Sequence, residues 1–146
     1  MTTSSEPALL DTNVLVYAYD SHDSRNEECR KLLAMGVSGA RNLCIAPQVL
    51  FEFIAVVTAP SQVTRPVSME EGLAEAEKLG KLLPVIGVPA DIHGSAVELM
   101  RRSRLGGRKI FDVVLAATML ANGVHTIYTF DGDHFSRVPG ITVRTP

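Results

Sequence analysis

Tryptophan is absent from this chain of 146 residues, which also has only two cysteines and few aromatic residues, 5% in all. Cys29 and Cys44 show neither CxxC nor another metal-ligand spacing, so we expect buried free thiols in a reducing compartment. No run approaches the ~18 uncharged apolar residues of a membrane span. The opening residues, MTTSSEPALLD, lack the basic and apolar segments of a secretory signal, so the expected location is the cytoplasm.

A strong charge of either sign is also missing. The formal net charge is −2, which excludes a global attraction to nucleic acid or membrane, so a polyanionic partner would need a local basic patch or a bound metal. Hydrophobic residues make up 46% of the chain and charged residues 21%, which is enough apolar side chain for a packed core. The length predicts a single domain over residues 1–146, with residues 1–7 as a flexible N-terminal extension.

Short apolar runs alternate along the chain with longer segments of helical periodicity. Ser24 with Glu27, and Ser68 with Glu71, have the S-x-x-E spacing of capping boxes, and Pro47 suits the first turn of a helix. Because parallel strands need crossover connections, this alternation predicts an α/β sandwich around a mainly parallel sheet. The expected strands are 7–10, 43–46, 85–88, 126–130 and 141–144, and the expected helices are 24–35, 47–58, 68–83, 91–104 and 111–121.

Four acidic residues lie inside apolar runs, where an unpaired carboxylate is costly. They are Asp11 in ALLDTNVLV, Glu52 in PQVLFEFIAVV, Asp112 in KIFDVVLAAT and Asp131 in IYTFDGDHF. Asp11 and Asp131 fall at the ends of expected strands, which is the edge where open α/β sheets bind ligands. We therefore expect the four acids to share one site. Their mutual repulsion calls for a cation, and oxygen ligands suit Mg²⁺ or Mn²⁺.

Each acid also has a purely local interpretation. Asp11 and Asp112 could cap helices, Asp131 could form a turn before Gly132, and Glu52 could face solvent on a half-buried helix. Glu52 is the hardest to explain in this way, because its apolar neighbours cover almost every direction of the helix.

Several segments together resemble the PIN-domain ribonucleases, most closely the VapC toxins of bacterial toxin/antitoxin pairs. They are LLDTNVLVYA, the isolated glutamate of PQVLFEF, FDVVLAATMLANGVHTIYTFD and the terminal strand, and the resemblance extends from about Ala8 to Val143. It implies a PIN-like three-layer sandwich. It also implies a Mg²⁺- or Mn²⁺-dependent endoribonuclease that hydrolyses phosphodiester bonds, with structured RNA such as transfer RNA as the expected substrate.

The resemblance places the family's four acidic positions on Asp11, Glu52, Asp112 and Asp131, with Asp133 close enough to share or replace the role of Asp131. It implies that Asp11 and Asp112 are the principal metal ligands, that Asp131 is a further ligand, and that Glu52 is a ligand or a base that orients water. Short polar side chains nearby are expected to fix these carboxylates. These are Thr12, Asn13 and Thr129.

The same resemblance implies a homodimer and a small cognate antitoxin, whose apolar segment packs on the toxin. The helices near 32–37 and 50–57 are candidate docking faces. Two other functions stay open: a metal-dependent phosphoaspartyl phosphatase or receiver domain, in which Asp11 would be phosphorylated, and a catalytically silent PIN-like interaction module.

Three further groups of residues have competing interpretations. The basic cluster of Arg101, Arg102, Arg104, Arg108 and Lys109 could bind the RNA backbone or could be a solvated helix end. The histidines form no HxxxH pattern, and we expect His134 to be a surface or hydrogen-bonded turn residue. Four aromatic residues could stack on bases, but packing in the core or an interface is the favoured interpretation. They are Tyr17, Tyr19, Phe51 and Phe53.

Overall fold

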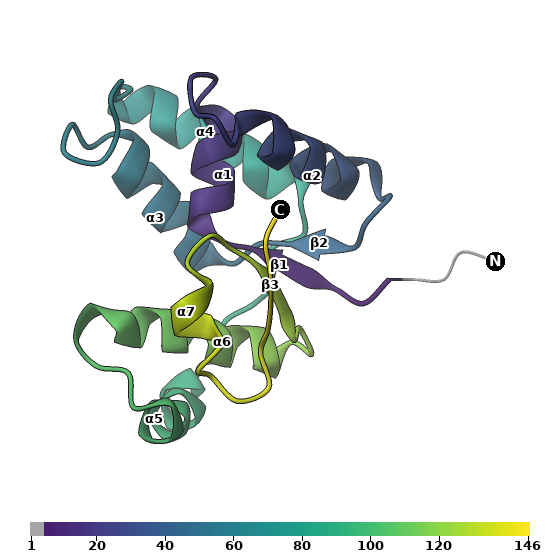
Figure 1. The fold of residues 1–146 in the computed structure, drawn as a ribbon, viewed down its shortest axis with the longest axis vertical. Coiled ribbons are helices and arrows are strands. Elements are labelled where there is room, and N and C mark those ends of the chain that lie inside the picture. The colour runs from purple at the N-terminus through teal and green to yellow at the C-terminus, as the bar shows by residue number, and fades with distance from the viewer. Residues whose placement is uncertain (1–4) are drawn as a thin grey trace.

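The computed structural model describes residues 5–146 and places four short parallel strands in one sheet (Figure 1). In chain order they are β1 (Ala8–Leu10), β2 (Leu43–Cys44), β3 (Thr126–Tyr128) and β4 (Thr142–Arg144), and their order across the sheet is β2-β1-β3-β4. Every neighbouring pair is parallel, with Ala8 opposite both Leu43 and Thr126. The predicted sandwich around a mainly parallel sheet is confirmed.

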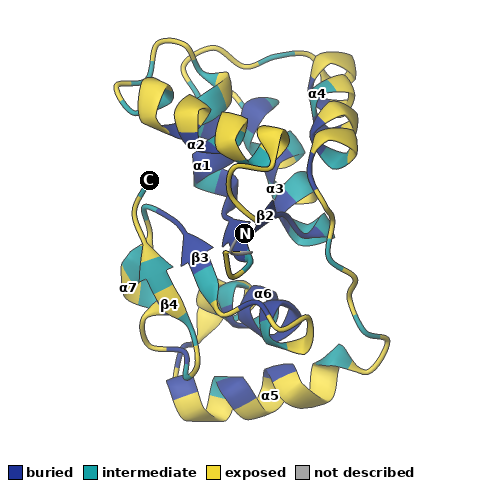
Figure 2. Ribbon diagram, turned by 90° about the vertical axis from the view of Figure 1, so that its right-hand side faces the viewer, coloured by how far each residue is buried: buried dark blue, intermediate teal, exposed yellow. Residues whose placement is uncertain are grey.

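Helices lie on both sides of the sheet and complete the three layers. Above it in Figure 1 are α1 (Thr12–Tyr19), α2 (Asn26–Ser38), α3 (Pro47–Val57) and α4 (Met69–Leu82). Below it are α5 (Ile92–Ser103), the 3-10 turn η1 (Gly107–Lys109) and α6 (Ile110–Ala121), and the short α7 (Gly132–Phe135) packs against α6. Strands β1 and β2 are buried, whereas Figure 2 shows that much of β4 and of α5 faces solvent.

Local sequence signals fix several helix ends as predicted. Pro47 is the first residue of α3, where its missing N–H leaves no hydrogen bond unmade. The Ser68 hydroxyl accepts a hydrogen bond from the Glu71 backbone N–H at 3.2 Å and so caps α4. Gly123 follows α6 with a φ of +71°, a conformation that glycine adopts without strain.

The predicted capping box of Ser24 and Glu27 is wrong. Helix α2 begins at Asn26, after a bend held by the Asp23 carboxylate. That carboxylate accepts hydrogen bonds from both the backbone N–H and the guanidinium of Arg25, each at 2.8 Å. An aspartate that binds the backbone two residues further on is a turn-former, and here it displaces the serine cap.

The predicted strand at 85–88 is also wrong. Only Val85 pairs with the sheet, through an isolated parallel bridge to Ile45. Val85 and Val88 are 42% and 47% exposed, so the segment is an extended link between α4 and α5. A run of valine and isoleucine forms a strand only where it packs against neighbours on both sides. Helices α1 and α7 are two elements that the sequence did not predict.

The main core lies between the sheet and the helices above it. Leu9, Leu10 and Ile127 from the strands and Val14 from α1 are fully buried in it. A smaller cluster joins α5 to α6. Both cysteines are buried and free, as predicted, and burial raises the pKa of each thiol to about 11.

Within residues 5–146, none of the helices combines the length and the apolar character needed to cross a bilayer. The expected N-terminal extension at 1–7 falls partly outside the described chain, because the description begins at Ser5.

Two phenylalanines on α3 should respond differently to truncation. Phe53 is fully buried, whereas Phe51 is 70% exposed. We expect Phe53→Ala to lower the free energy of unfolding by about 3–5 kcal/mol through the cavity that it leaves. Phe51→Ala should lower it by less than about 0.5 kcal/mol. Urea unfolding followed by circular dichroism measures both values, and equal losses would contradict the packing of α3.

Candidate active site

A cavity of about 310 Å³ lies at the carboxyl ends of β1 and β3, and all four acids expected to share a site line it. Asp11 follows β1 directly, and Asp131 comes shortly after β3. Glu52 extends from α3, and Asp112 lies in the first turn of α6. The fold thus gathers acids from four separate segments. The other lining residues are Thr12, Asn13, Val16, Tyr17, Val56 and Gln62.

Asp11 is the most buried of the four acids, with 8% of its surface exposed. It caps α1, because its Oδ1 accepts the Thr12 backbone N–H at 2.8 Å, and its Oδ2 accepts the Thr129 hydroxyl at 2.7 Å. Burial nevertheless raises the pKa of Asp11 to about 6, and the nearby charges of Asp112 and Glu52 raise it further. The cap is therefore real but does not offset the cost of burying this charge.

Asn13 and Thr129 connect the end of β1 to the end of β3. The Asn13 side-chain amide donates to the Thr129 hydroxyl oxygen at 3.2 Å and to Oδ2 of Asp131 at 3.3 Å. The backbone N–H of Asp131 donates to the same Thr129 oxygen at 2.9 Å. Both residues were expected to fix the carboxylates, and these contacts place them where they hold Asp11 and Asp131 in position.

Glu52 is half-buried and both of its carboxylate oxygens accept hydrogen bonds. The Thr12 hydroxyl donates to Oε2 at 2.9 Å, and the Gln48 side-chain amide donates to Oε1 at 2.9 Å. Gln48 also donates to the carbonyl oxygen of Phe111 at 2.9 Å, so it joins α3 to the start of α6. Sequence reasoning missed Gln48, although its position four residues before Glu52 on one helix indicates contact.

Asp112 contacts a histidine that was not expected at this site. His134 Nδ1 lies 2.8 Å from Asp112 Oδ2, and both side chains are about a third exposed. Burial raises the pKa of Asp112, and the contact with His134 opposes that rise. His134 was expected to be a surface or hydrogen-bonded turn residue, and α7 turns it so that its hydrogen-bond partner is a site acid. Asp133 is exposed and does not line the cavity, whereas Asp131 does.

The donors suit a hard divalent cation, since all four acids offer oxygen only. Within residues 5–146, however, no three side chains of histidine, cysteine, aspartate or glutamate lie close enough to share one ion. In this arrangement Thr12 and Gln48 donate hydrogen bonds to Glu52, and His134 contacts Asp112. The residues fit a metal by their chemistry, and side-chain rotation would be needed to complete its shell.

The expected RNA-binding cluster surrounds the entry to α6 without lining the cavity. Its five basic residues are all exposed, and Arg101 pairs with Glu98 at 3.5 Å. The remaining four have no carboxylate partner within residues 5–146. They are Arg102, Arg104, Arg108 and Lys109.

The raised pKa of Asp11 predicts how stability changes with pH in metal-free solution. This carboxyl ionises near 3.8 in the unfolded chain and near 6 in the folded protein, so the folded state binds more protons between these values. The free energy of unfolding therefore falls by up to about 3 kcal/mol as the pH rises from about 4 to about 6, because the buried carboxyl loses its proton.

Asp11→Asn removes this titration, so the parent should lose stability relative to the variant across that range. Urea unfolding of both proteins in EDTA at several pH values measures the difference. A difference that does not change with pH would contradict the burial of Asp11.

The sequence matches the PIN domain family over residues 8–141. No curated protein sequence matches it significantly.

Solved structures share the fold over nearly the whole chain. A VapBC2 complex of Rickettsia felis bound to a promoter DNA fragment is 22% identical, with a TM-score of 0.67, and the match covers 96% of this chain and 98% of that one. VapC20 of Mycobacterium tuberculosis, described as a sarcin–ricin loop cleaving toxin, is 22% identical, with a TM-score of 0.69 and 95% and 99% covered. FitAcB of Neisseria gonorrhoeae is 17% identical, with a TM-score of 0.61 and 95% and 97% covered.

At these identities the structures support the fold, and the sequence match supports the family. Because that match spans well over half of the residues, the chain belongs to the PIN domain family.

Proposed function

We propose that this protein is a metal-dependent endoribonuclease toxin of the VapC type, which hydrolyses RNA phosphodiester bonds and is neutralised by a cognate antitoxin. The observation that supports it most strongly is the gathering of four carboxylates at one cavity, with Asp11 buried among them. A buried charge of this kind is stable only with a compensating partner. A divalent cation supplies that compensation and the chemistry of a nuclease.

In this proposal Asp11 and Asp112 hold Mg²⁺ or Mn²⁺, with Asp131 as a further ligand. When bound, the cation would lower the pKa of a coordinated water and offset the charge that develops on the phosphate. Glu52 would orient that water or accept its proton, because Thr12 and Gln48 fix its carboxylate. Asn13 and Thr129 keep Asp11 and Asp131 at the cavity.

The two alternative functions have less support. A phosphorylated aspartate must be open to its phosphate donor, but Asp11 is 8% exposed and both of its oxygens accept hydrogen bonds. A silent interaction module would gain nothing from a buried carboxylate whose pKa is raised. The substrate we propose is structured RNA such as transfer RNA, in the cytoplasm. VapC20, which shares the fold, is described as a sarcin–ricin loop cleaving toxin.

Replacing one buried acid tests the chemistry. Asp11→Asn should lower the rate of Mg²⁺- or Mn²⁺-dependent RNA cleavage by about 100-fold or more, because charge stabilisation by a bound metal is worth several kcal/mol. Asp133→Asn is the matched control and should cleave at close to the parent rate, since Asp133 does not line the cavity. Cleavage of a labelled transfer RNA measures both. Full activity in Asp11→Asn would refute the proposed chemistry.

The basic cluster offers a second test of RNA contact. Reversing the charge of Arg102 and Arg104, both exposed at the end of α5, should weaken cleavage and reduce its dependence on salt. Each phosphate contact that is lost should lower the slope of log affinity against log salt by about 1. An unchanged slope over a range of NaCl concentrations would show that this cluster is only a solvated helix end.

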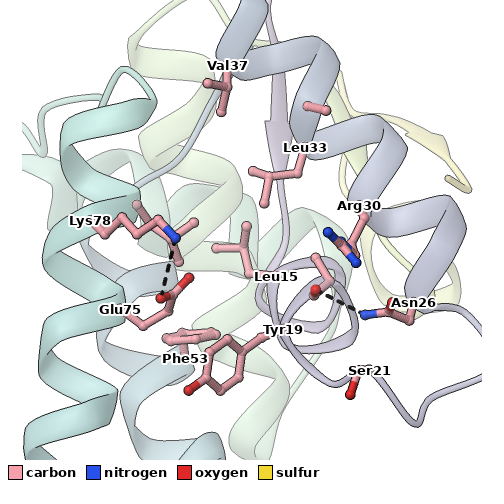
Figure 3. Close-up of a pocket in the computed structure, with 13 residues that line it drawn as sticks. Leu15, Tyr19, Ser21, Asn26, Arg30, Leu33, Val37, Phe53, Glu75 and Lys78 are labelled. Atoms are coloured by element: carbon pink, nitrogen blue, oxygen red, sulfur yellow. Dashed lines mark hydrogen bonds and ion pairs between the residues drawn. The ribbon is translucent and has the colours of Figure 1, made fainter.

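A second cavity is lined by residues of both expected docking faces. It has a volume of about 440 Å³, lies between α2 and α4 over α1, and is largely apolar (Figure 3). Leu33, Ala34 and Val37 line it from the expected docking face at 32–37, and Phe53 lines it from the face at 50–57. Glu75 and Lys78 border it from α4. We propose that the apolar segment of the antitoxin packs here, and that the toxin itself is a homodimer.

A charge placed in this second cavity should separate toxicity from neutralisation. Ala34→Arg should leave the toxin active in cells but reduce the relief of growth arrest by the cognate antitoxin. Ala34 is exposed in the free protein, so docking of an apolar segment would bury the new guanidinium at a cost. Ala74→Arg, on an exposed position of α4 that does not line the cavity, is the control and should be relieved like the parent. Equal relief of both variants would place the antitoxin elsewhere.

A further inference from the structure

We propose that Phe51 and Phe111 each stack on an RNA base beside the bond to be cut. The proposal rests on the nuclease function above and adds how the substrate is held. Of the five phenylalanines, Phe53 and Phe135 are fully buried and Phe130 packs edge-on against Tyr17. Phe51 and Phe111 are 70% and 56% exposed, more than any other large hydrophobic residue within 5–146.

Both exposed rings are the immediate chain neighbours of site acids. Phe51 precedes Glu52 and Phe111 precedes Asp112, and both acids line the cavity. Gln48 connects the two places, because its amide donates to Glu52 and to the Phe111 carbonyl oxygen. Neither ring lines the cavity itself. Each ring is therefore exposed one residue before a site acid, Phe51 on α3 and Phe111 at the start of α6.

The chemistry of a bound RNA strand explains this arrangement. If the phosphate that is cut lies among the acids, the base on each side of it is separated from it by one sugar. Such a base can stack on an aromatic side chain just outside the cavity. A phenyl ring accepts any base on its face, so it binds without requiring a given sequence. The acids repel a polyanion, and Arg108 and Lys109, exposed just before Phe111, supply the opposite charge for the neighbouring phosphates.

A second copy of the chain suits this face less well. A two-fold contact centred on Phe111 would bring two copies of Arg108 and Lys109 close together, which is unfavourable. The other candidate aromatics are already occupied. Tyr17 lines the cavity, but the Arg25 guanidinium covers its ring at 3.5 Å. Tyr19 packs edge-on against Phe53, with ring centroids 5.8 Å apart.

Leucine substitutions separate stacking from simple apolar contact. Phe51→Leu/Phe111→Leu keeps apolar side chains but removes the flat faces. Binding is measured in EDTA, so that no cleavage occurs, with a short fluorescent RNA that the parent cleaves and with the same RNA made abasic on both sides of the cleaved bond. The matched control is Met69→Leu, because Met69 is 55% exposed at the start of α4.

We expect the double variant to bind the intact RNA about tenfold more weakly than the parent. Parent and variant should bind the abasic RNA equally, because the rings then have no base to stack on. Met69→Leu should match the parent on both RNAs.

Other results would overturn the proposal. Equal losses on intact and abasic RNA would show that the rings contact no base. Unchanged RNA binding with a shift from dimer to monomer in light scattering would assign the face to a second copy. If the parent cleaves RNA but the double variant binds RNA as tightly as the parent, stacking is refuted and the nuclease function still stands. A parent that neither binds nor cleaves RNA would refute the nuclease function, and stacking with it.

Discussion

The carboxylate of Asp11 is withdrawn from water at the end of β1, and the rest of the site is arranged around it. The parallel sheet sets this position, because β1 lies between β2 and β3 and Asp11 directly follows its carboxyl end. Thr12 and Thr129 each donate one hydrogen bond to the buried group. These two bonds do not balance the loss of hydration, and the pKa of Asp11 stays about two units above that of an exposed aspartate.

Two of the neighbouring acids have hydrogen-bond partners of their own. Glu52 is held by Thr12 and Gln48, and Asp112 is held by His134, so each carboxylate has a neutral or basic partner. These partners keep the acids near one cavity without drawing them into contact. The arrangement suits a site that gains a cation reversibly, since the hydrogen bonds replace part of what the cation would supply.

Much of this site could be predicted from local sequence, because its acids stand out against apolar neighbours and at strand ends. Glu52 was singled out in this way, and the structure places it at the cavity. Gln48 and His134 could not be found so directly, because their contacts depend on how α3, α6 and α7 pack. The same limit applies to the fold. Helix α1 contains valine and tyrosine that favour strands, and the run at 85–88 looks like a strand but has no partners beyond Val85.

The central claim is that these carboxylates bind a divalent cation, and Mn²⁺ in a crystal of the protein tests it most directly. We predict an anomalous scattering peak in the cavity, where oxygens of Asp11 and Asp112 would bind the ion. Binding should displace His134 from Asp112 or leave it on the oxygen that the cation does not use. A cavity without Mn²⁺ in crystals of a protein that cleaves RNA in the same Mn²⁺ buffer would contradict the account.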